Sequence, residues 1–216
     1  MKQHLIFILT CMVSSIALYA SDKPEGAMQI IGPKGTTLIS EKTGGKLDWP
    51  FEEGVLTVKL KKGHAITAIP LASFKAHIEF CVNEKKGNPG NNGNSGIYIQ
   101  QRYELQILNS FGRDKEYSNT DCGSIYKTKK PDAIVCLPAG EWQSYDIEFH
   151  AAQWEEDKKT SNARITVIHN GTMIHDNFEI PNKTGHGAEE GPGKRPLRLQ
   201  NHGNDVKFRN FWLLEI

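Results

Sequence analysis

Hydrophobic residues recur at every second position over several short segments of this chain, which is the pattern of strands that bury one face. Turn-forming residues separate these segments, and no window has the pattern of an amphipathic helix with capping residues. The alternation predicts an all-β fold, a sandwich or jelly roll of two antiparallel sheets. The predicted strands cover 55–60, 74–82, 95–108, 142–149, 163–169, 172–180, 197–200 and 206–214.

Two connections between these strands stand out. Asn170-Gly171 is the strongest hairpin signal, because both residues tolerate a positive φ. Residues 183–195 form a glycine-rich loop whose length is typical of functional lids and rims.

The composition is that of an ordinary globular protein. Charged residues make up 24% and hydrophobic residues 38% of the 216 residues, and the formal net charge is +1. Nucleic-acid binding would require a clustered basic excess, so we expect no nucleic-acid partner. The mean hydropathy of −0.49 argues against a protein with several membrane spans.

The first residues predict export. Met1-Lys2 precedes an apolar stretch that runs to Ala20, and this stretch is shorter than a membrane span requires. We expect a signal peptide over residues 1–20, cleaved after Ala20, and a single domain over residues 21–216 in the periplasm or on the surface of a bacterium. Lipidation at Cys11 is the rival interpretation.

Three cysteines remain after such cleavage. Cys122 and Cys136 are the nearer pair, and an oxidising compartment favours a disulfide between them with Cys81 free. Closing that ring would contribute about 3 kcal/mol. The alternative is three buried thiols.

The segment 95–108, interpreted as one long strand, carries the main functional signal. One of its faces is apolar, whereas the other consists of planar hydrogen-bonding side chains that match sugar hydroxyls and carbonyls. That polar face comprises Tyr98, Gln100, Arg102, Glu104 and Gln106. The alternative is a solvated edge with a local Arg102–Glu104 ion pair.

Two other strands are expected to extend this polar face. Glu79 lies on the polar side of 74–82, and Gln200 is followed one strand period later by His202. These side chains could perform acid–base chemistry, because the ordinary pKa of histidine is near neutrality and a carboxylate beside an arginine stays ionised. No zinc spacing or other metal-ligand motif is present, so no cofactor is expected; a divalent metal stays possible without support from any motif.

The same residues carry a family resemblance. The chain resembles the 3-keto-disaccharide hydrolase domain family over about residues 35–216, through an ordered series of motifs. They are Asn94-Ser95-Gly96-Ile97-Tyr98, 102–107 (RYELQI), 121–126 (DCGSIY), 140–147 (GEWQSYDI), 162–167 (NARITV), Asn170-Gly171, His175, 199–203 (LQNHG) and 206–212 (VKFRNFW). The resemblance implies a concanavalin-like, laminarinase-like jelly-roll β-sandwich.

It also implies cleavage of glycosides whose glucosyl C3 is already a ketone, supplied by an upstream sugar-oxidising dehydrogenase. A C3 ketone acidifies the C2 proton, so a base can remove it, the C1 leaving group departs by β-elimination, and water adds back. The expected catalytic residues are His202, Glu104 and Arg102. Arg102 would hold the C3 oxygen, and His202 is favoured over Glu104 as the base. The expected substrate-binding residues are Glu79, Tyr98, Gln106 and Gln200.

Two other functions stay open. A conventional glycoside hydrolase on the same fold needs two carboxylates at a defined separation. A non-catalytic carbohydrate-binding module usually displays aromatic platforms, and only Tyr98 is expected on the polar face.

Overall fold

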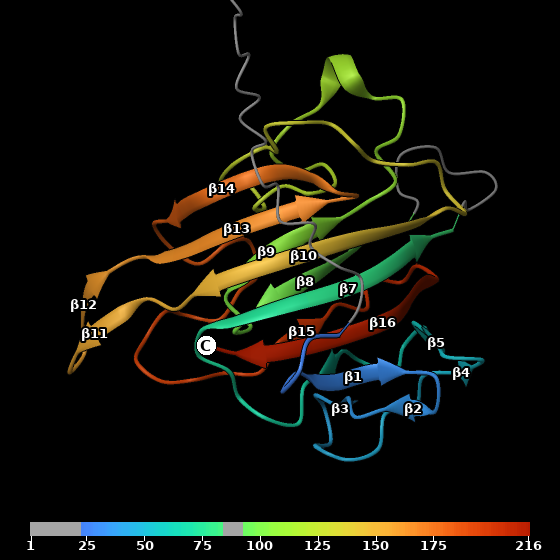
Figure 1. Ribbon diagram of the computed structural model, residues 1–216, viewed down its shortest axis with the longest axis horizontal. Coiled ribbons are helices and arrows are strands. Elements are labelled where there is room, and N and C mark those ends of the chain that lie inside the picture. The colour runs from blue at the N-terminus through green and yellow to red at the C-terminus, as the bar shows by residue number, and fades with distance from the viewer. Residues whose placement is uncertain (1–22, 84–92) are drawn as a thin grey trace, which may run out of the picture.

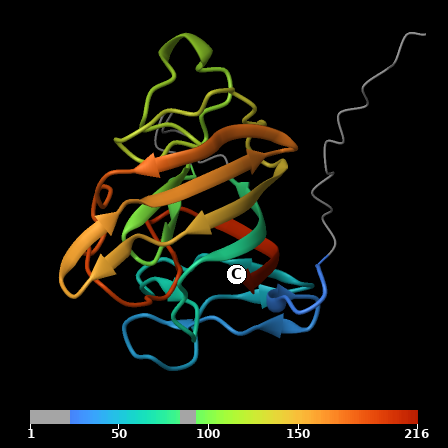
Figure 2. The same ribbon diagram turned by 60° about the vertical axis from the view of Figure 1, so that its left-hand side comes forward.

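A computed structural model describes residues 23–83 and 93–216, and the predicted signal peptide therefore lies outside the described residues. The chain forms two antiparallel sheets that pack face to face (Figures 1 and 2). This arrangement confirms the predicted all-β sandwich. Within the described residues, no helix is long and apolar enough to cross a membrane.

The larger sheet has nine strands. Its main path runs β14 (Thr172–Ile180), β13 (Ala163–His169), β10 (Trp142–His150), β7 (Phe74–Val82), β16 (Val206–Glu215), β1 (Met28–Gly32) and β2 (Gly35–Thr36). The short strands β5 (Val55–Thr57) and β4 (Phe51–Glu52) extend from β16.

The smaller sheet has five strands and lies behind β10, β7 and β16 in Figure 1. Its order is β3 (Ile39–Ser40), β6 (Ala65–Ile66), β15 (Arg198–Leu199), β8 (Ser95–Ile99) and β9 (Tyr103–Ile107). A separate hairpin pairs β11 (Gln153–Glu155) with β12 (Lys158–Ser161), and one 3-10 turn, η1, spans Asp114–Glu116.

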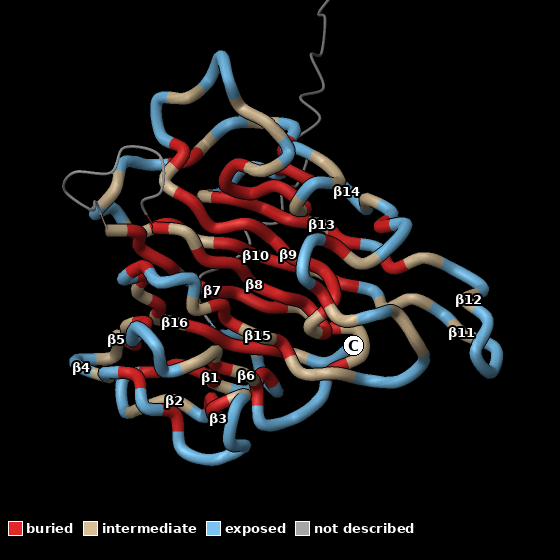
Figure 3. The backbone as a smooth tube through the Cα atoms, turned by 180° about the vertical axis from the view of Figure 1, so that it is seen from behind, coloured by how far each residue is buried: buried red, intermediate tan, exposed pale blue. Residues whose placement is uncertain are grey.

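The hydrophobic core fills the space between the two sheets. The inward side chains of β7 and β10 meet those of β8 and β9, and the rings of Tyr103 and Phe149 lie 5.7 Å apart across this interface. The Tyr145 hydroxyl donates a hydrogen bond to the Gln106 carbonyl at 2.8 Å, which ties the two sheets together. Viewed from behind, the buried backbone runs through the strands of both sheets, and exposed positions concentrate in the loops (Figure 3).

The long predicted strands agree well with the strands that the structure contains. β7, β13 and β14 have the expected bounds, and Asn170 and Gly171 form the predicted hairpin turn with φ values of 50° and 79°. The prediction of one strand over 95–108 is wrong, because Gln100 and Gln101 adopt left-handed conformations, with φ values of 50° and 54°, and fold the segment into the β8–β9 hairpin.

The cysteine prediction is not realised in the structure. Cys81, Cys122 and Cys136 are all buried free thiols, so the expected Cys122–Cys136 bond is not formed. Burial raises the pKa of the Cys122 thiol well above its ordinary value, and Cys136 lies close enough to contribute. The bond stays a prediction for the protein in an oxidising compartment.

Candidate active site

The face of the smaller sheet that points away from the core carries two rows of polar side chains. Residues directly opposite on paired strands share a face, so the strand register defines these rows. The first row consists of Tyr126, Glu104, Tyr98 and Arg198. The second consists of Ser124, Gln106, Gly96, Gln200 and His64. Segment 123–126 enters both rows because it pairs with β9 as an additional edge.

Glu104 is the central acidic group of the first row. The residue is only 3% exposed, and the Tyr98 hydroxyl donates a hydrogen bond to its Oε2 at 2.8 Å. Burial raises the pKa of the Glu104 carboxyl to about 7, against the lowering effects of the Tyr98 hydrogen bond and the charges of Arg198 and Lys127. A carboxyl group with this pKa can accept or release a proton near neutral pH.

Two glycines make room for this carboxyl group. A Cβ on Gly96 would lie 2.5 Å from Glu104 Oε1. A Cβ on Gly185 would lie 3.2 Å from Glu104 Oε2 and 2.8 Å from Tyr126 Cδ1, at a φ of +46°. The carboxyl group of Glu104 therefore bends over Gly96, and Gly185 lies between it and the Tyr126 ring.

The titration of Glu104 predicts a pH-dependent stability difference. Its folded pKa, about 7, exceeds the ordinary value of 4.5, so its contribution to stability is complete below pH 4.5 and is lost as pH rises through 7. Above pH 7, we expect the free energy of unfolding of Glu104→Gln to exceed that of the native protein by up to about 3 kcal/mol, because glutamine stays neutral. Urea titrations of both proteins across this range measure the difference, and a difference independent of pH would contradict the prediction.

The second row offers hydrogen-bond acceptors. Gln106 and Gln200 are 4% and 9% exposed, and no described residue donates a hydrogen bond to the Oε1 atom of either. Buried acceptors of this kind usually have partners, and sugar hydroxyls are suitable donors. The Gln200 amide also donates to the Tyr98 hydroxyl at 3.4 Å, which connects the two rows.

His64 is a residue of this face that the sequence analysis did not select. Its Nδ1 accepts the backbone N–H of Asn201 at 2.9 Å, so the neutral ring carries its proton on Nε2. Burial, and then the charge of Arg198, lower the pKa of His64 and favour this neutral form. The ring is therefore a hydrogen-bond donor at the end of the second row.

Tyr126 and Lys127 were also missed as site residues, although Tyr126 lies in a recognised motif. The Lys127 ammonium lies 5.4 Å from the centre of the Tyr126 ring, and its charge lowers the pKa of Glu104. Lys127 is exposed and has a left-handed φ of 58°. Strained backbone of this kind is concentrated at functional sites.

Arg102 does not share the Glu104 face, and this corrects the sequence analysis. Because it occupies the turn between β8 and β9, its guanidinium points to the 183–195 loop and donates to the carbonyls of Glu189 at 3.2 Å and Gly193 at 3.4 Å. The expected Arg102–Glu104 pair, and with it a low pKa for Glu104, is wrong.

Glu79 lies on the other sheet, so its expected place beside Tyr98 is also wrong. It belongs to β7 and faces away from the core, where Arg209 Nε lies 2.6 Å from its Oε2 and Asn210 Nδ2 lies 2.9 Å from its Oε1. His77, its neighbour on that face, lies 2.7 Å from Asp146. Glu79 is part of an ionic network of the larger sheet, on the far side of the core from Glu104.

This network predicts a second pH effect. Burial would lower the pKa of His77, but Asp146 and Glu79 raise it to about 9, from an ordinary value of 6.5. The resulting stability is complete below pH 6.5 and is lost as pH rises through 9, by up to about 3 kcal/mol. We expect His77→Gln to remove this decline in urea titrations, whereas His150→Gln, at the exposed end of β10, should retain it. Parallel profiles for His77→Gln and the native protein would contradict the prediction.

His202 lies at the edge of the candidate site. It is exposed in the turn after β15, and its charge acts on His64. Among the described residues, its side chain makes no hydrogen bond. The face thus brings together Tyr98, Glu104, Gln106 and Gln200, with His202 beside them, and it excludes Arg102 and Glu79.

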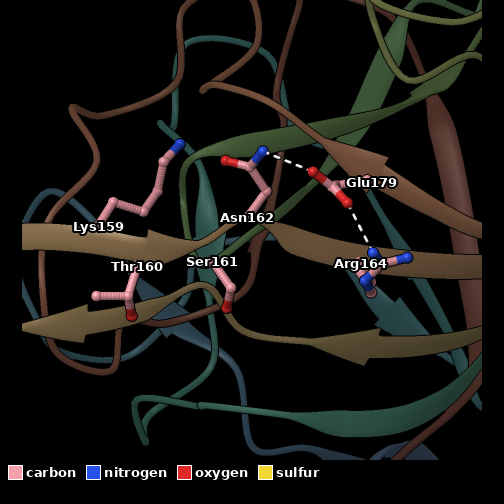
Figure 4. A pocket seen from close by; sticks show the side chains of 6 residues that line it. All are labelled: Lys159, Thr160, Ser161, Asn162, Arg164 and Glu179. Carbon is pink, nitrogen blue, oxygen red and sulfur yellow. Dashed lines mark hydrogen bonds and ion pairs between the residues drawn. The ribbon is translucent and has the colours of Figure 1, made fainter.

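The pocket in Figure 4 is a different feature, located on β12, β13 and β14. It has a volume of about 360 Å³, and its charged groups already have partners: Glu179 accepts from Asn162 at 2.9 Å and from Arg164 at 2.6 Å, and Lys159 pairs with Glu190 outside the pocket at 2.6 Å. Among the described residues, no group of three or more His, Cys, Asp or Glu could hold a metal ion.

Comparisons with known proteins agree with this picture. The family described as the 3-keto-alpha-glucoside-1,2-lyase-like domain matches residues 35–214. A crystal structure from Parabacteroides distasonis, provisionally described as a glycosyl hydrolase, is 34% identical, with a TM-score of 0.82 over 89% of this chain and 85% of that one. A second protein of the same organism and description is 21% identical, with a TM-score of 0.61 over 88% of this chain and 99% of that one, and shares the fold. No curated protein sequence matches.

Proposed function

Since this chain belongs to the 3-keto-alpha-glucoside-1,2-lyase-like domain family and is a carbohydrate-active enzyme, we propose that it cleaves 3-keto-glucosides by β-elimination. Glu104 removes the C2 proton, the C1–oxygen bond breaks, and the electrons form the C1–C2 double bond of the 3-keto product. Water can then add across that bond. The proton ends on Glu104 and passes to the leaving group or to solvent.

The observation that carries this proposal is a single buried carboxyl group with a pKa near neutrality. Beyond the rows, Glu41 follows β3, and its carboxyl group is already engaged, because Arg198 pairs with it at 3.4 Å and the Gln101 amide donates to it at 2.6 Å. Conventional glycosidases need two carboxyl groups that both act on the sugar. The face therefore supports one base more readily than a pair.

The remaining groups have distinct roles in this proposal. The Tyr98 hydroxyl holds Oε2 of Glu104 and leaves Oε1 for the substrate. Gln106 and Gln200 accept sugar hydroxyls, and His64 donates a hydrogen bond. The positive charge of Lys127 stabilises the enolate oxygen at C3 as negative charge develops. Arg198 is less available, because it stacks on the Tyr98 ring at 4.0 Å and pairs with Glu41 at 3.4 Å.

The test compares a 3-keto-glucoside with its unoxidised parent, in deuterated water. We expect release of the aglycone from the keto compound only, with a rate that falls when C2 carries deuterium. Equal cleavage of the parent would establish a conventional glycosidase instead. Binding of either sugar without cleavage would establish a carbohydrate-binding module.

The glycine beneath Glu104 gives a milder test. Gly96 has an ordinary backbone conformation, so alanine fits the strand, but its Cβ would displace the carboxyl group from above residue 96. We expect Gly96→Ala to lower kcat by about tenfold to a hundredfold, since small misplacements of a reacting group are costly. Steady-state kinetics measure this loss, and the control is Gly45→Ala, where the added Cβ would meet only Thr43 Oγ1 at 3.6 Å. Native kcat in Gly96→Ala would contradict the placement of Glu104.

We also propose that the chain is exported to the periplasm or cell surface through residues 1–20. The substrate would then be supplied by an enzyme that oxidises C3 of a glucoside. Fractionation of cells that express the full chain tests the location.

A further inference from the structure

The 183–195 loop is tied to the turn between β8 and β9 by several contacts. Gly187 lies so close to this turn that a Cβ there would be 2.0 Å from the Arg102 carbonyl oxygen. The Thr184 N–H donates to that same carbonyl at 3.0 Å, and the Ala188 N–H donates to the Gln101 carbonyl at 2.8 Å. This loop, expected to be a lid or rim, is thus held against the sheet.

The same loop contacts the backbone and the carboxyl group of Glu104. The Glu104 N–H donates to Thr184 Oγ1 at 2.6 Å, and Thr184 is 2% exposed. The next residue, Gly185, lies against Glu104 Oε2 and the Tyr126 ring. Any movement of 184–185 would therefore alter both the position of Glu104 and its access to water.

Arg102 is the charged group at the base of this loop. It is 5% exposed, and its guanidinium donates to the carbonyls of Glu189 and Gly193 and to the Gln100 side chain at 3.3 Å. Among the described residues, it makes no ion pair. A buried arginine without a carboxylate partner is costly, so its multiple bonds to loop carbonyls indicate a specific positioning role.

We propose that Arg102 is a positioning residue that fastens the 183–195 loop over Glu104 and thereby keeps its carboxyl group in place and shielded from water. This inference rests on the proposed function, because it assigns Arg102 a role in placing the base. The charges that act directly on Glu104 are those of Arg198 and Lys127, and the Tyr98 hydroxyl bonds to it. A change in Glu104 after removal of Arg102 would therefore be indirect, and two of the three hydrogen bonds of the guanidinium lead to the loop, the third to Gln100 in the turn.

The experiment uses Arg102→Met, which keeps the bulk of the side chain, and Arg102→Lys, which keeps its charge but loses the fork of donors. Arg164→Met is the matched control, because Arg164 forms the exposed pair with Glu179 in Figure 4 and does not contact the loop. Each protein is examined by amide hydrogen exchange, by carbon NMR titration of the Glu104 carboxyl group, and by the pH profile of kcat/KM.

For Arg102→Met we expect the Glu104 amide to exchange at least about tenfold faster. We also expect the pKa of Glu104 to fall from about 7 toward its ordinary value, and the acidic limb of kcat/KM to move with it. Arg102→Lys should give smaller changes in the same direction. Native exchange and native titration in both folded variants would overturn the proposal.

The experiment distinguishes failure of the proposed function from failure of the role assigned to Arg102. Hydrogen exchange and carboxyl titration do not require turnover, so they test the role of Arg102 even if the native protein cleaves no 3-keto-glucoside. Should Arg102→Met fail to fold, Arg102→Lys provides both readouts, and a native result there overturns the proposal.

Discussion

Glu104→Gln is expected to lower the turnover of a 3-keto-glucoside by about 10²–10⁴-fold, which is the usual contribution of a positioned general base. Glutamine preserves the shape of the side chain and can still contact Tyr98 and the space above Gly96. It cannot accept the C2 proton. Because the lost step is chemical, we expect the decrease in kcat, with KM changed much less. Steady-state kinetics with C2-protonated and C2-deuterated substrate measure the loss and its isotope dependence.

The control for this experiment is Glu79→Gln. Glu79 is also a partly buried strand carboxylate with strong hydrogen bonds, but it lies on the larger sheet, beyond the core. Folded Glu79→Gln should retain native turnover. Native turnover by Glu104→Gln, with His202→Ala impaired instead, would move the base to the exposed edge of the site and contradict our assignment.

Lys127→Met is expected to lower kcat by about 10²–10³-fold, the range observed when one donor to a developing oxyanion is removed. The ammonium group attracts the C3 oxygen most strongly when the enolate forms, so the effect should fall on kcat more than on KM. Methionine keeps much of the length of the side chain and its contact with the Tyr126 ring.

Lys129→Met is the matched control two residues further along. Its ammonium pairs with Asp132 at 2.5 Å and lies 5.7 Å from the centre of the Phe178 ring, on a different surface. Equal losses in the two variants would indicate a general effect on this segment. A native kcat in Lys127→Met would exclude Lys127 as the group that stabilises the enolate.

The sequence was sufficient for much of the fold because the long strands alternate clearly. β7, β13 and β14 follow from period-two burial, and the turn at Asn170-Gly171 follows from the conformational freedom of its two residues. The turn at Gln100-Gln101 escaped prediction because glutamine has no particular preference for the left-handed conformation that both residues adopt.

The sequence predicts only part of the candidate site, because the site is assembled by pairing between strands that are far apart in the sequence. Tyr98, Glu104 and Gln106 share a face in a single strand and also in the hairpin, so this prediction was unaffected by the missed turn. Arg102 was misplaced because it lies in that turn. His64 reaches the face only through the pairing of β6 with β15, more than a hundred residues away, which no local pattern reveals.

The protonation of Glu104 was misjudged for a related reason. A carboxylate next to an arginine in sequence was expected to have a low pKa, but the two side chains point in different directions and burial dominates. The structure consequently favours Glu104 over His202 as the base, since burial alone brings its pKa near neutrality.

The connection between β8 and β9 also limits which changes of length this protein can tolerate. Ile99 pairs with Tyr103, and three residues, 100–102, join them. Deleting or inserting one residue there is tolerated only if Ile99 stays opposite Tyr103, because a one-residue shift of β9 against β8 would turn every side chain of β9 over, sending Glu104 into the core and Leu105 to the polar face. Homologues that retain the carboxyl group at this position should therefore keep this pairing register, whatever the length of their loop.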